Sequence, residues 1–277
     1  MKEIIQSRQN PLVKTVYSLL DKKHRRAMKL FRFDGVKLFS EALLCGVDIK
    51  HVVVSEGASE ACRRAVDTAI QSGALSDDKV IWVSESVFDK LSEERSPEGI
   101  ITVASQLSHV AELKGAEALL EEIAPGEPIL LAEALRDPGN LGTVIRSCAA
   151  LGIEALVLSA DCADMYNPKT VRAAMGGLFR LRIYILPEGG MPSAIVGLKN
   201  TGRGVYAAAL SRDSVDISKL TLKAGDCFVI GNEGHGLSDE VIKACSGSCI
   251  IPMRAGCESL NASAAAAICI WETVKVH

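Results

Sequence analysis

The chain has 277 residues, a formal net charge of −3, 48% hydrophobic residues and only 4% aromatic ones, a composition typical of an α/β protein with an aliphatic core. No apolar run approaches the roughly 20 residues of a membrane-spanning helix, and the N-terminus lacks the apolar core of a signal peptide. These observations argue against a membrane protein and predict a cytoplasmic one.

The charge is unevenly distributed along the chain. Residues 1–50 hold 11 Lys and Arg against 5 Asp and Glu, a net charge of +6, so the remainder carries −9. A short basic stretch in this part is typical of a solvated helix face, and it also suits contact with the phosphates of a nucleic acid. The candidate RNA-binding residues are Lys22, Lys23, Arg25, Arg26, Lys29 and Arg32.

The first 105 residues alternate between helix and strand patterns. Asn10 followed by Pro11 predicts a helix start, because Asn caps a helix well and Pro fits its first turn, and a basic helix is expected to continue toward Lys29. The alternation predicts a small α/β domain over residues 1–105. Its expected strands cover 31–33, 49–55, 80–83 and 100–104, and its expected helices 36–45, 59–72 and 86–94.

Residues 106–128 are polar and charged and end in Pro-Gly-Glu-Pro, so they are predicted to link two domains. The second domain is expected over 129–277, where strand patterns are apolar almost throughout and helix patterns separate them. Such strands predict a parallel sheet covered on both faces. Its expected strands cover 129–132, 155–159, 181–186, 205–210, 227–230 and 248–251, with helices over about 143–150 and from near 167, 192 and 238.

The last strand leads into a polar bend and an alanine-rich helix. Pro252 ends the strand because it lacks a backbone donor, and Gly256 permits a tight bend. Ser259 and Asn261 are good N-cap residues for the helix that follows, in which Ala264, Ile268 and Trp271 share one face. This arrangement can hold a site between a buried strand and a buried helix, although an ordinary connection is the alternative.

The nine cysteines contain no Cys-x-x-Cys pair. Cys245 and Cys249 flank a loop of small residues, and His235 is the one nearby imidazole, which makes a poor zinc half-site. We therefore predict buried, reduced thiols and no metal.

Three polar, glycine-bearing segments each follow a predicted strand of the second half, at residues 136–146, 230–237 and 250–261. Loops at the carboxyl ends of parallel strands line one edge of a sheet, so the three segments are expected to converge. Neither a Gly-x-Gly-x-x-Gly fingerprint nor a phosphate-binding Gly-x-x-x-x-Gly-Lys loop occurs, which argues against the common nucleotide sites.

Taken together, the three segments resemble the motifs of the SpoU (TrmH-type) RNA ribose 2′-O-methyltransferases of the SPOUT superfamily. Motif one is Asp-Pro-Gly-Asn-Leu-Gly-Thr-Val-Ile-Arg at 137–146, motif two is Phe-Val-Ile-Gly-Asn-Glu-Gly-His-Gly-Leu at 228–237, and motif three spans 251–263. Residues 167–176 also resemble the family, and the similarity covers roughly 129–272.

The first half resembles, more faintly, the ribosomal-protein-L30e-like substrate-binding domain of the same family. The similarity lies at residues 34–43 and 96–100. Asp34 stands where Glu is usual, and Glu98 stands where Gln is usual. Neither departure touches the three motifs.

The resemblance implies a SPOUT α/β knot, in which a parallel sheet is tied into a deep trefoil knot that binds S-adenosylmethionine, joined to a smaller L30e-like α/β domain. It also implies a homodimer. The implied activity is S-adenosylmethionine-dependent methylation of a ribose 2′-hydroxyl in ribosomal RNA, with transfer RNA as the second choice. The alternatives are a non-catalytic RNA-binding factor in ribosome assembly and a base methyltransferase of a sister SPOUT family.

The resemblance also assigns site residues. Family carry-over makes Arg146 the general base, but a guanidinium stays protonated in proteins, so we prefer a role in which Arg146 grips an RNA phosphate and stabilises the forming alkoxide. The expected catalytic residues are Asn140, Arg146, Glu233, Ser259 and Asn261, and the expected cofactor-binding residues are Ile230, Gly231, Asn232, Ile251, Met253 and Leu260.

Several of these residues have a second interpretation. Asn140 is expected to orient Arg146 or the ribose, or else to cap the helix near Thr143. Glu233 is expected to position Arg146 or Asn140, or else to be a solvated loop acid. Ser259 and Asn261 are expected to orient the ribose or the cofactor loop, with helix capping as the alternative. His235 has a suitable pKa for a base but stands at a variable position of its motif.

Overall fold

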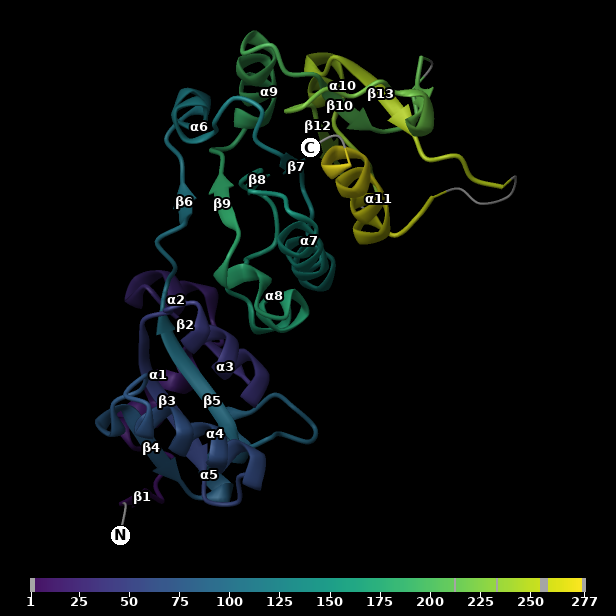
Figure 1. Ribbon diagram of the computed structural model, residues 1–277. Helices are drawn as coiled ribbons and strands as arrows, with labels where there is room; N and C mark the ends of the chain where they lie inside the picture. Colours follow the sequence, from purple (N-terminus) through teal and green to yellow (C-terminus); the bar gives the residue numbers. More distant parts are fainter. Residues whose placement is uncertain (1–2, 212, 233, 255–258, 276–277) are drawn as a thin grey trace. The chain divides into compact units, whose positions relative to one another are not determined.

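The computed structural model describes residues 3–211, 213–232, 234–254 and 259–275 (Figure 1). The chain divides into two compact units. Unit 1 contains Met1–Leu107 and Asp164–Phe179, and unit 2 contains Ser108–Ala163 and Arg180–His277. A stretch from the middle of the second half therefore packs with the first half, which the sequence did not suggest.

Unit 1 is built on a five-stranded sheet of order β1-β4-β3-β5-β2. Strand β5 runs antiparallel to both β2 and β3, whereas β3, β4 and β1 are parallel. Its strands are β1 (Ile4–Ile5), β2 (Leu30–Asp34), β3 (Ile49–Ser55), β4 (Val80–Val83) and β5 (Ile100–Ser105). Its α-helices are α1 (Pro11–Ser18), α2 (Lys22–Met28), α3 (Val36–Leu44), α4 (Glu60–Gln71), α5 (Glu85–Leu91) and α8 (Pro168–Ala174), with 3₁₀ turns at Asp77–Lys79 and Gly177–Phe179.

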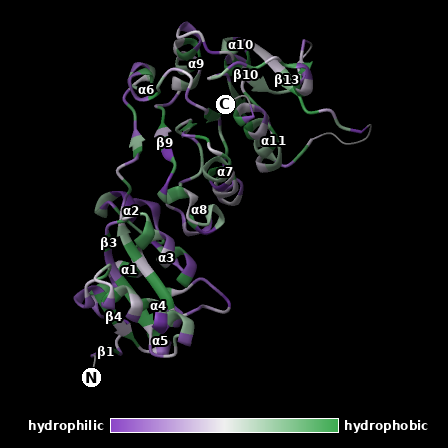
Figure 2. Ribbon diagram, viewed as in Figure 1, coloured by the Kyte–Doolittle hydropathy of each residue, from purple (hydrophilic) through white to green (hydrophobic). Residues whose placement is uncertain are grey.

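The predicted basic helix is in fact two helices. Asn10 caps α1 as expected, by accepting a hydrogen bond from the backbone of Leu12. Asp21 then caps α2 by accepting from Lys23 at 2.6 Å, so a new helix begins at Lys22. Helix α2 is mostly hydrophilic, as its purple ribbon shows in Figure 2. It ends at Met28, and its C-cap Lys29 has a left-handed backbone with φ +53°.

Within the described residues, unit 2 is built on an eight-stranded sheet of order β11-β13-β10-β12-β7-β8-β9-β6. Every ladder in it is parallel, which confirms the predicted parallel sheet. Its strands are β6 (Val110–Glu112), β7 (Ile129–Ala132), β8 (Ala155–Leu158), β9 (Arg182–Ile185), β10 (Val205–Ala208), β11 (Val215–Asp216), β12 (Cys227–Ile230) and β13 (Gly247–Ile250). Its α-helices are α6 (Ala116–Glu122), α7 (Pro138–Leu151), α9 (Gly190–Asn200), α10 (Asp239–Ala244) and α11 (Ala262–Val274), with a 3₁₀ turn at Ile217–Lys219.

The central strands hold unit 2 together. All four residues of each of β7, β8 and β12 are buried, because helices cover the sheet. Helix α11 packs beside α7 and against β12, and Figure 1 shows the two helices side by side. Helices α6, α9 and α10 form a second group, in which α9 packs with each of the other two.

Two expectations need adjustment. Residues 106–128, expected to form a linker, contain β6 and α6, which belong to unit 2. Helix α7 begins at Pro138, five residues before the predicted start, because Asp137 caps it by accepting from the backbone of Asn140 at 2.8 Å. Asn140 therefore lies inside the first turn and is not the cap. The functional domain boundaries and the trefoil knot stay predictions.

The cysteines have the predicted character. Eight are described, all are free thiols, and seven of these are buried. Burial raises the pKa of Cys62 to about 11 and that of Cys227 to about 12. Among the described residues, no helix has both the length and the apolar character to cross a membrane, and no cluster of His, Cys, Asp and Glu could hold a metal ion.

Candidate active site

The three sequence motifs follow strands that end at the same edge of the parallel sheet. Motif one follows β7, motif two follows β12 directly beside it, and motif three follows β13, which β10 separates from β12. This edge is where parallel α/β sheets bind ligands.

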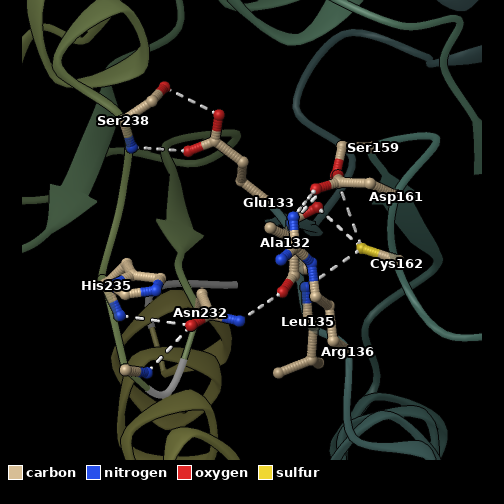
Figure 3. Close-up of polar contacts among 12 residues, drawn as sticks. Ala132, Glu133, Leu135, Arg136, Ser159, Asp161, Cys162, Asn232, His235 and Ser238 are labelled. Carbon is tan, nitrogen blue, oxygen red and sulfur yellow. Dashed lines mark hydrogen bonds and ion pairs between the residues drawn. The ribbon is translucent and has the colours of Figure 1, made fainter.

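Motifs one and two are joined through the amide of Asn232 (Figure 3). Its Nδ2 donates to the carbonyl oxygen of Ala134 at 2.9 Å, while its Oδ1 accepts from the backbone of Gly234 and His235 at 2.8 and 3.1 Å. Ala134 has a left-handed backbone with φ +54°, which is costly for a residue with a Cβ. Asn232 thus ties the loop after β12 to a strained turn after β7.

A carboxylate forms a second link between the same loops. Glu133 accepts hydrogen bonds from both the backbone nitrogen and the hydroxyl of Ser238, at 2.8 and 2.7 Å (Figure 3). Ser238 is the N-cap of α10, where a negative charge is favourable. Neither residue was predicted from the sequence as a site residue, although Glu133 comes directly after a predicted strand and Ser238 lies where a helix was expected to begin.

The loop of motif two is closely packed on itself. Asn232 and Gly236 form a backbone pair with hydrogen bonds of 3.0 Å in both directions. A Cβ on Gly231 would lie 2.4 Å from the carbonyl carbon of Gly236, so another side chain cannot fit there without moving backbone. Gly231 is therefore required by the loop itself, whatever ligand the loop binds.

Motifs one and three meet through two asparagines. The Nδ2 of Asn261 donates to the Oδ1 of Asn140 at 3.0 Å. The Oδ1 of Asn261 accepts from the backbone and hydroxyl of Ser263 and caps α11, as its position in the sequence predicted. Asn261 thus caps α11, which was the alternative expected from the sequence, and it also contacts motif one; its role toward the ribose or the cofactor loop stays a prediction.

The remaining predicted residues surround these contacts. Arg146 is exposed on α7, two turns after Asn140. Ile230 is buried at the end of β12, whereas Met253 and Leu260 are 42% and 41% exposed. Ile251 is half-buried and Ser259 is exposed, and Glu233 lies outside the described residues. Exposed apolar side chains beside backbone-rich loops suit the adenosine part of S-adenosylmethionine, which binds through ring contacts and backbone hydrogen bonds.

A cleft of about 500 Å³ lies beside motif one. Across it, Nη2 of Arg136 donates to Oδ2 of Asp161 at 2.9 Å. Burial opposes ionisation of Asp161, but hydrogen bonds from Ser159 and Arg136 outweigh it and lower the pKa of the carboxyl. The cleft is lined by Glu133, Arg136, Ser159, Ala160, Asp161, Glu188, Gly189, Gly190, Met191, Pro192, Ser238 and Glu240.

The predicted RNA-binding residues of unit 1 fall into two groups. Arg25 and Arg32 are only 2% and 1% exposed, so their guanidinium groups are inside the unit and unavailable to an RNA backbone. Arg25 is paired with Asp164, and Arg32 is paired with Asp34 at 3.1 Å, which is how each buried charge is tolerated. The exposed members of the predicted set are Lys22, Lys23, Arg26 and Lys29.

Comparison with known families and structures agrees with these motifs. Residues 127–271 match the model of the SpoU rRNA Methylase family, and residues 10–102 match that of the MRM3-like substrate binding domain. The chain is 30% identical to the 23S rRNA (guanosine(2553)-2'-O)-methyltransferase RlmP of Bacillus subtilis, over 98% of each chain.

Solved structures are also similar over the whole length. An RNA 2′-O ribose methyltransferase matches with a TM-score of 0.79 and 27% identity, covering 99% of both chains. An rRNA methyltransferase from Sinorhizobium meliloti with bound AdoMet matches with a TM-score of 0.80 and 28% identity, covering 99% of this chain and 97% of the other. The mixed α/β fold with a smaller N-terminal α/β domain is thus shared with an RNA 2′-O ribose methyltransferase and an rRNA methyltransferase.

Proposed function

Because the chain belongs to the SpoU rRNA methylase family, we propose that it transfers the methyl group of S-adenosylmethionine to a ribose 2′-hydroxyl in ribosomal RNA. The observation that carries this proposal is the hydrogen bond between Asn140 and Asn261, which brings motif one and motif three to one place. A scaffold that had lost catalysis would have no need to keep two such amides aligned. Ribosomal RNA as the target also suggests a cytoplasmic location.

The cofactor supplies a methyl group activated by a positively charged sulfur. We assign its binding to the residues predicted for it, of which Gly231 contributes backbone and Met253 and Leu260 contribute exposed apolar surface. Asn232 acts indirectly, because its side chain is occupied in holding the motif-two loop. The full set is Ile230, Gly231, Asn232, Ile251, Met253 and Leu260. The trefoil knot belongs to this proposal.

Arg146 is the residue that we place at the reacting hydroxyl. Its guanidinium cannot take up a proton at neutral pH, so it holds the RNA phosphate next to the target ribose and stabilises the negative charge that develops on the 2′-oxygen. Asn140, held by Asn261, orients the ribose beside it. Glu233 and Ser259 complete the proposed catalytic set.

The central test is methyl transfer by the purified chain. With labelled S-adenosylmethionine and total ribosomal RNA, the parent should place label on ribose 2′-oxygens, and Arg146→Ala should lose about 10²-fold or more in single-turnover rate. Equal rates for parent and Arg146→Ala on saturating RNA would remove both roles given to this arginine. A parent that binds neither the cofactor, measured by calorimetry, nor RNA would refute the activity itself.

The exposed cations of α2 are the proposed RNA contacts of unit 1. Neutralising Lys22, Lys23 and Arg26 together should weaken RNA binding and lower the slope of log affinity against log salt by about 2 for single-stranded contacts. Arg64 of the same unit forms an exposed ion pair with Glu60 and is the matched control, so Arg64→Ala should leave the slope unchanged. An unchanged slope in the triple variant would move the RNA surface elsewhere.

The outer face of α11 is the proposed interface of a homodimer. Its inner face is buried through Ala266, Cys269 and Ile270, whereas Trp271, near the C-terminal end of the helix, is 56% exposed. We assign this exposed tryptophan to the association surface because aromatic side chains of this kind are enriched at protein interfaces. Trp271→Glu should convert a dimer into a monomer in light scattering, and a parent that is monomeric at micromolar concentration would overturn this assignment.

A further inference from the structure

The segment 164–179 connects the two units of the chain in an unusual way. It lies in sequence between β8 and β9 of unit 2, yet it packs as part of unit 1. The chain therefore passes between the units at three peptide bonds, after Leu107, after Ala163 and after Phe179. The unit 1 residues at these three crossings are Leu107, Asp164 and Phe179. Their contacts determine how firmly each connection is anchored in unit 1.

Each of the three boundary residues is fixed inside unit 1. The backbone nitrogen of Leu107 donates to the hydroxyl of Tyr166 at 2.9 Å. Asp164 accepts from Nη2 of Arg25 at 2.6 Å, and the ring of Phe179 packs 5.3 Å from that of Phe33. Two of these anchors, Asp164 and Tyr166, are themselves joined, because the backbone of Tyr166 donates to Oδ1 of Asp164 at 3.0 Å.

Arg25 is the centre of this arrangement. It is 2% exposed, and the side chain of Asp164 is 16% exposed. The Nη1 of Arg25 donates to the carbonyl oxygens of Leu19 and Leu20 at 2.8 and 2.7 Å, so the guanidinium also fixes the turn that precedes α2. Charge-assisted hydrogen bonds of this kind are strong and directional, and more so away from water.

Helix α2 is also the helix whose exposed cations we assign to RNA. Lys22, Lys23 and Arg26 lie on its solvent side, while Arg25 points inward to Asp164. The end of β5 is attached to the same helix, since Gln106 donates from its side chain to the carbonyl oxygen of Arg25 at 3.2 Å. Helix α2 is therefore connected to Asp164 by one buried ion pair, so a shift of α2 on RNA binding would be expected to shift Asp164 as well.

On the other side of the boundary, the residues before Asp164 hold the start of motif one. The backbone of Ala163 donates to the carbonyl oxygen of Leu135 at 2.9 Å, and the backbone of Leu135 donates to Sγ of Cys162 at 3.4 Å. The hydroxyl of Ser159 accepts from Ala134 at 2.9 Å (Figure 3). The loop that leads into α7, and so to Asn140, is thus hydrogen-bonded to Ser159, Cys162 and Ala163, which lie within the five residues before Asp164.

We propose that Arg25 and Asp164 are positioning residues for methyl transfer, because their ion pair fixes the chain at Ala163 and through it the loop of motif one when RNA occupies α2. This inference rests on the proposed function. The link consists of one buried ion pair, one peptide bond and one loop, and neither residue touches the substrate. It does not require any particular placement of the two units beyond their covalent connection.

The test compares two ion pairs of the same segment. Asp164→Asn keeps the Oδ1 that accepts from Tyr166 but removes the charge that holds Arg25. Arg172→Gln breaks the pair between α8 and Glu94, 3.2 Å in the parent, and serves as the matched control. Arg25→Lys, which keeps the charge but cannot reach both carbonyl oxygens and the carboxylate, is the second variant in case Asp164→Asn does not fold.

Single-turnover methylation at saturating ribosomal RNA should fall about tenfold in Asp164→Asn, with cofactor affinity within about twofold of the parent. Arg172→Gln should stay within about twofold in both. Hydrogen exchange of the backbone amides at 135–140 should become faster in Asp164→Asn and not in Arg172→Gln. This exchange readout does not depend on activity, so it separates the link from the proposed function.

Three outcomes would overturn the proposal. Asp164→Asn with a parental rate and parental exchange at 135–140 would show that the ion pair does not position the loop. Equal losses in Arg172→Gln would mean that the segment matters only for general packing. Weaker RNA binding with an unchanged rate on bound RNA would limit Asp164 to supporting α2. If the parent methylates no RNA, but exchange at 135–140 is still faster in Asp164→Asn than in the parent, the proposed function would be refuted and the structural link would remain.

Discussion

The hydrogen bond between Asn140 and Asn261 can be removed without removing the cap of α11. In Asn261→Asp, the Oδ1 that caps the helix remains, but the second oxygen cannot donate to Asn140. The lost bond costs about 1 kcal/mol, while a negative charge at a helix start returns about 0.5 kcal/mol, so the stability should change little. In Asn261→Ala the cap is lost as well, for a total of about 2 kcal/mol.

These values predict different effects on stability and on rate. Asn261→Ala should lower the melting temperature by about 4–8 °C and Asn261→Asp by about 2 °C or less. Both should slow single-turnover methyl transfer about fivefold, because about 1 kcal/mol of positioning is lost in each. In the background of Asn140→Ala, Asn261→Asp should have no further effect on the rate, which corresponds to a coupling energy of about 1 kcal/mol.

The assay follows labelled methyl transfer to ribosomal RNA with enzyme in excess. Ser263→Ala is the control, because it removes the 2.6 Å hydrogen bond from the Ser263 hydroxyl to Asn261 without affecting the contact with Asn140. It should keep the parental rate. The reasoning fails if Asn261→Asp is as fast as the parent while Asn261→Ala is slow, since capping alone would then explain the loss. It also fails if the effects of the two asparagine substitutions on the activation free energy simply add.

Three further predictions concern single residues. Gly231→Ala should destabilise the chain by about 3 kcal/mol and abolish cofactor binding in calorimetry, because the new Cβ would lie 2.4 Å from the backbone of Gly236, whereas Gly234→Ala, with its nearest atom at 3.6 Å, should be tolerated. Ala134→Gly should raise the melting temperature, because relief of a left-handed φ of +54° should stabilise the folded chain by up to about 1 kcal/mol. A melting temperature below that of the parent would refute the strain. Burial raises the pKa of Cys227 from 9.0 to about 12, so the stability it contributes is complete below pH 9 and is lost toward pH 12. Cys227→Ala should therefore reduce the fall of the urea midpoint as the pH rises above 9, and an unchanged slope would contradict it.

The elements of unit 2 could be predicted where local sequence determines them. The bounds of β7 and β12 agree with prediction, because each is a run of four apolar residues between polar or turn-forming neighbours. The start of α7 was missed, although Asp137 followed by Pro138 is a good helix-start signal. Gly139 and Gly142 have low helix propensity and concealed the first turn, which the cap and packing stabilise.

Charge alone could not predict which cations of unit 1 are exposed to solvent. A basic stretch suggested six cations facing RNA, but Arg25 and Arg32 are buried. The partner of Arg25 is Asp164, which lies 139 residues away, so no local pattern distinguishes Arg25 from its exposed neighbours on α2. Arg32 pairs with a carboxylate only two residues away, yet alternation along a strand does not show which side of the sheet is covered.

The contacts of the candidate active site were also not predictable from local sequence, because their partners lie far apart in the chain. The contacts that join the motifs span 98 residues from Asn232 to Ala134 and 121 residues from Asn261 to Asn140. The first contact requires that β7 and β12 end at the same edge, and the second requires that β7 and β13 do, so both depend on the folded sheet. Opening of this edge should therefore remove cofactor binding before the sheet itself unfolds. The resemblance could identify the motif residues, whereas the folded sheet explains why they act only together.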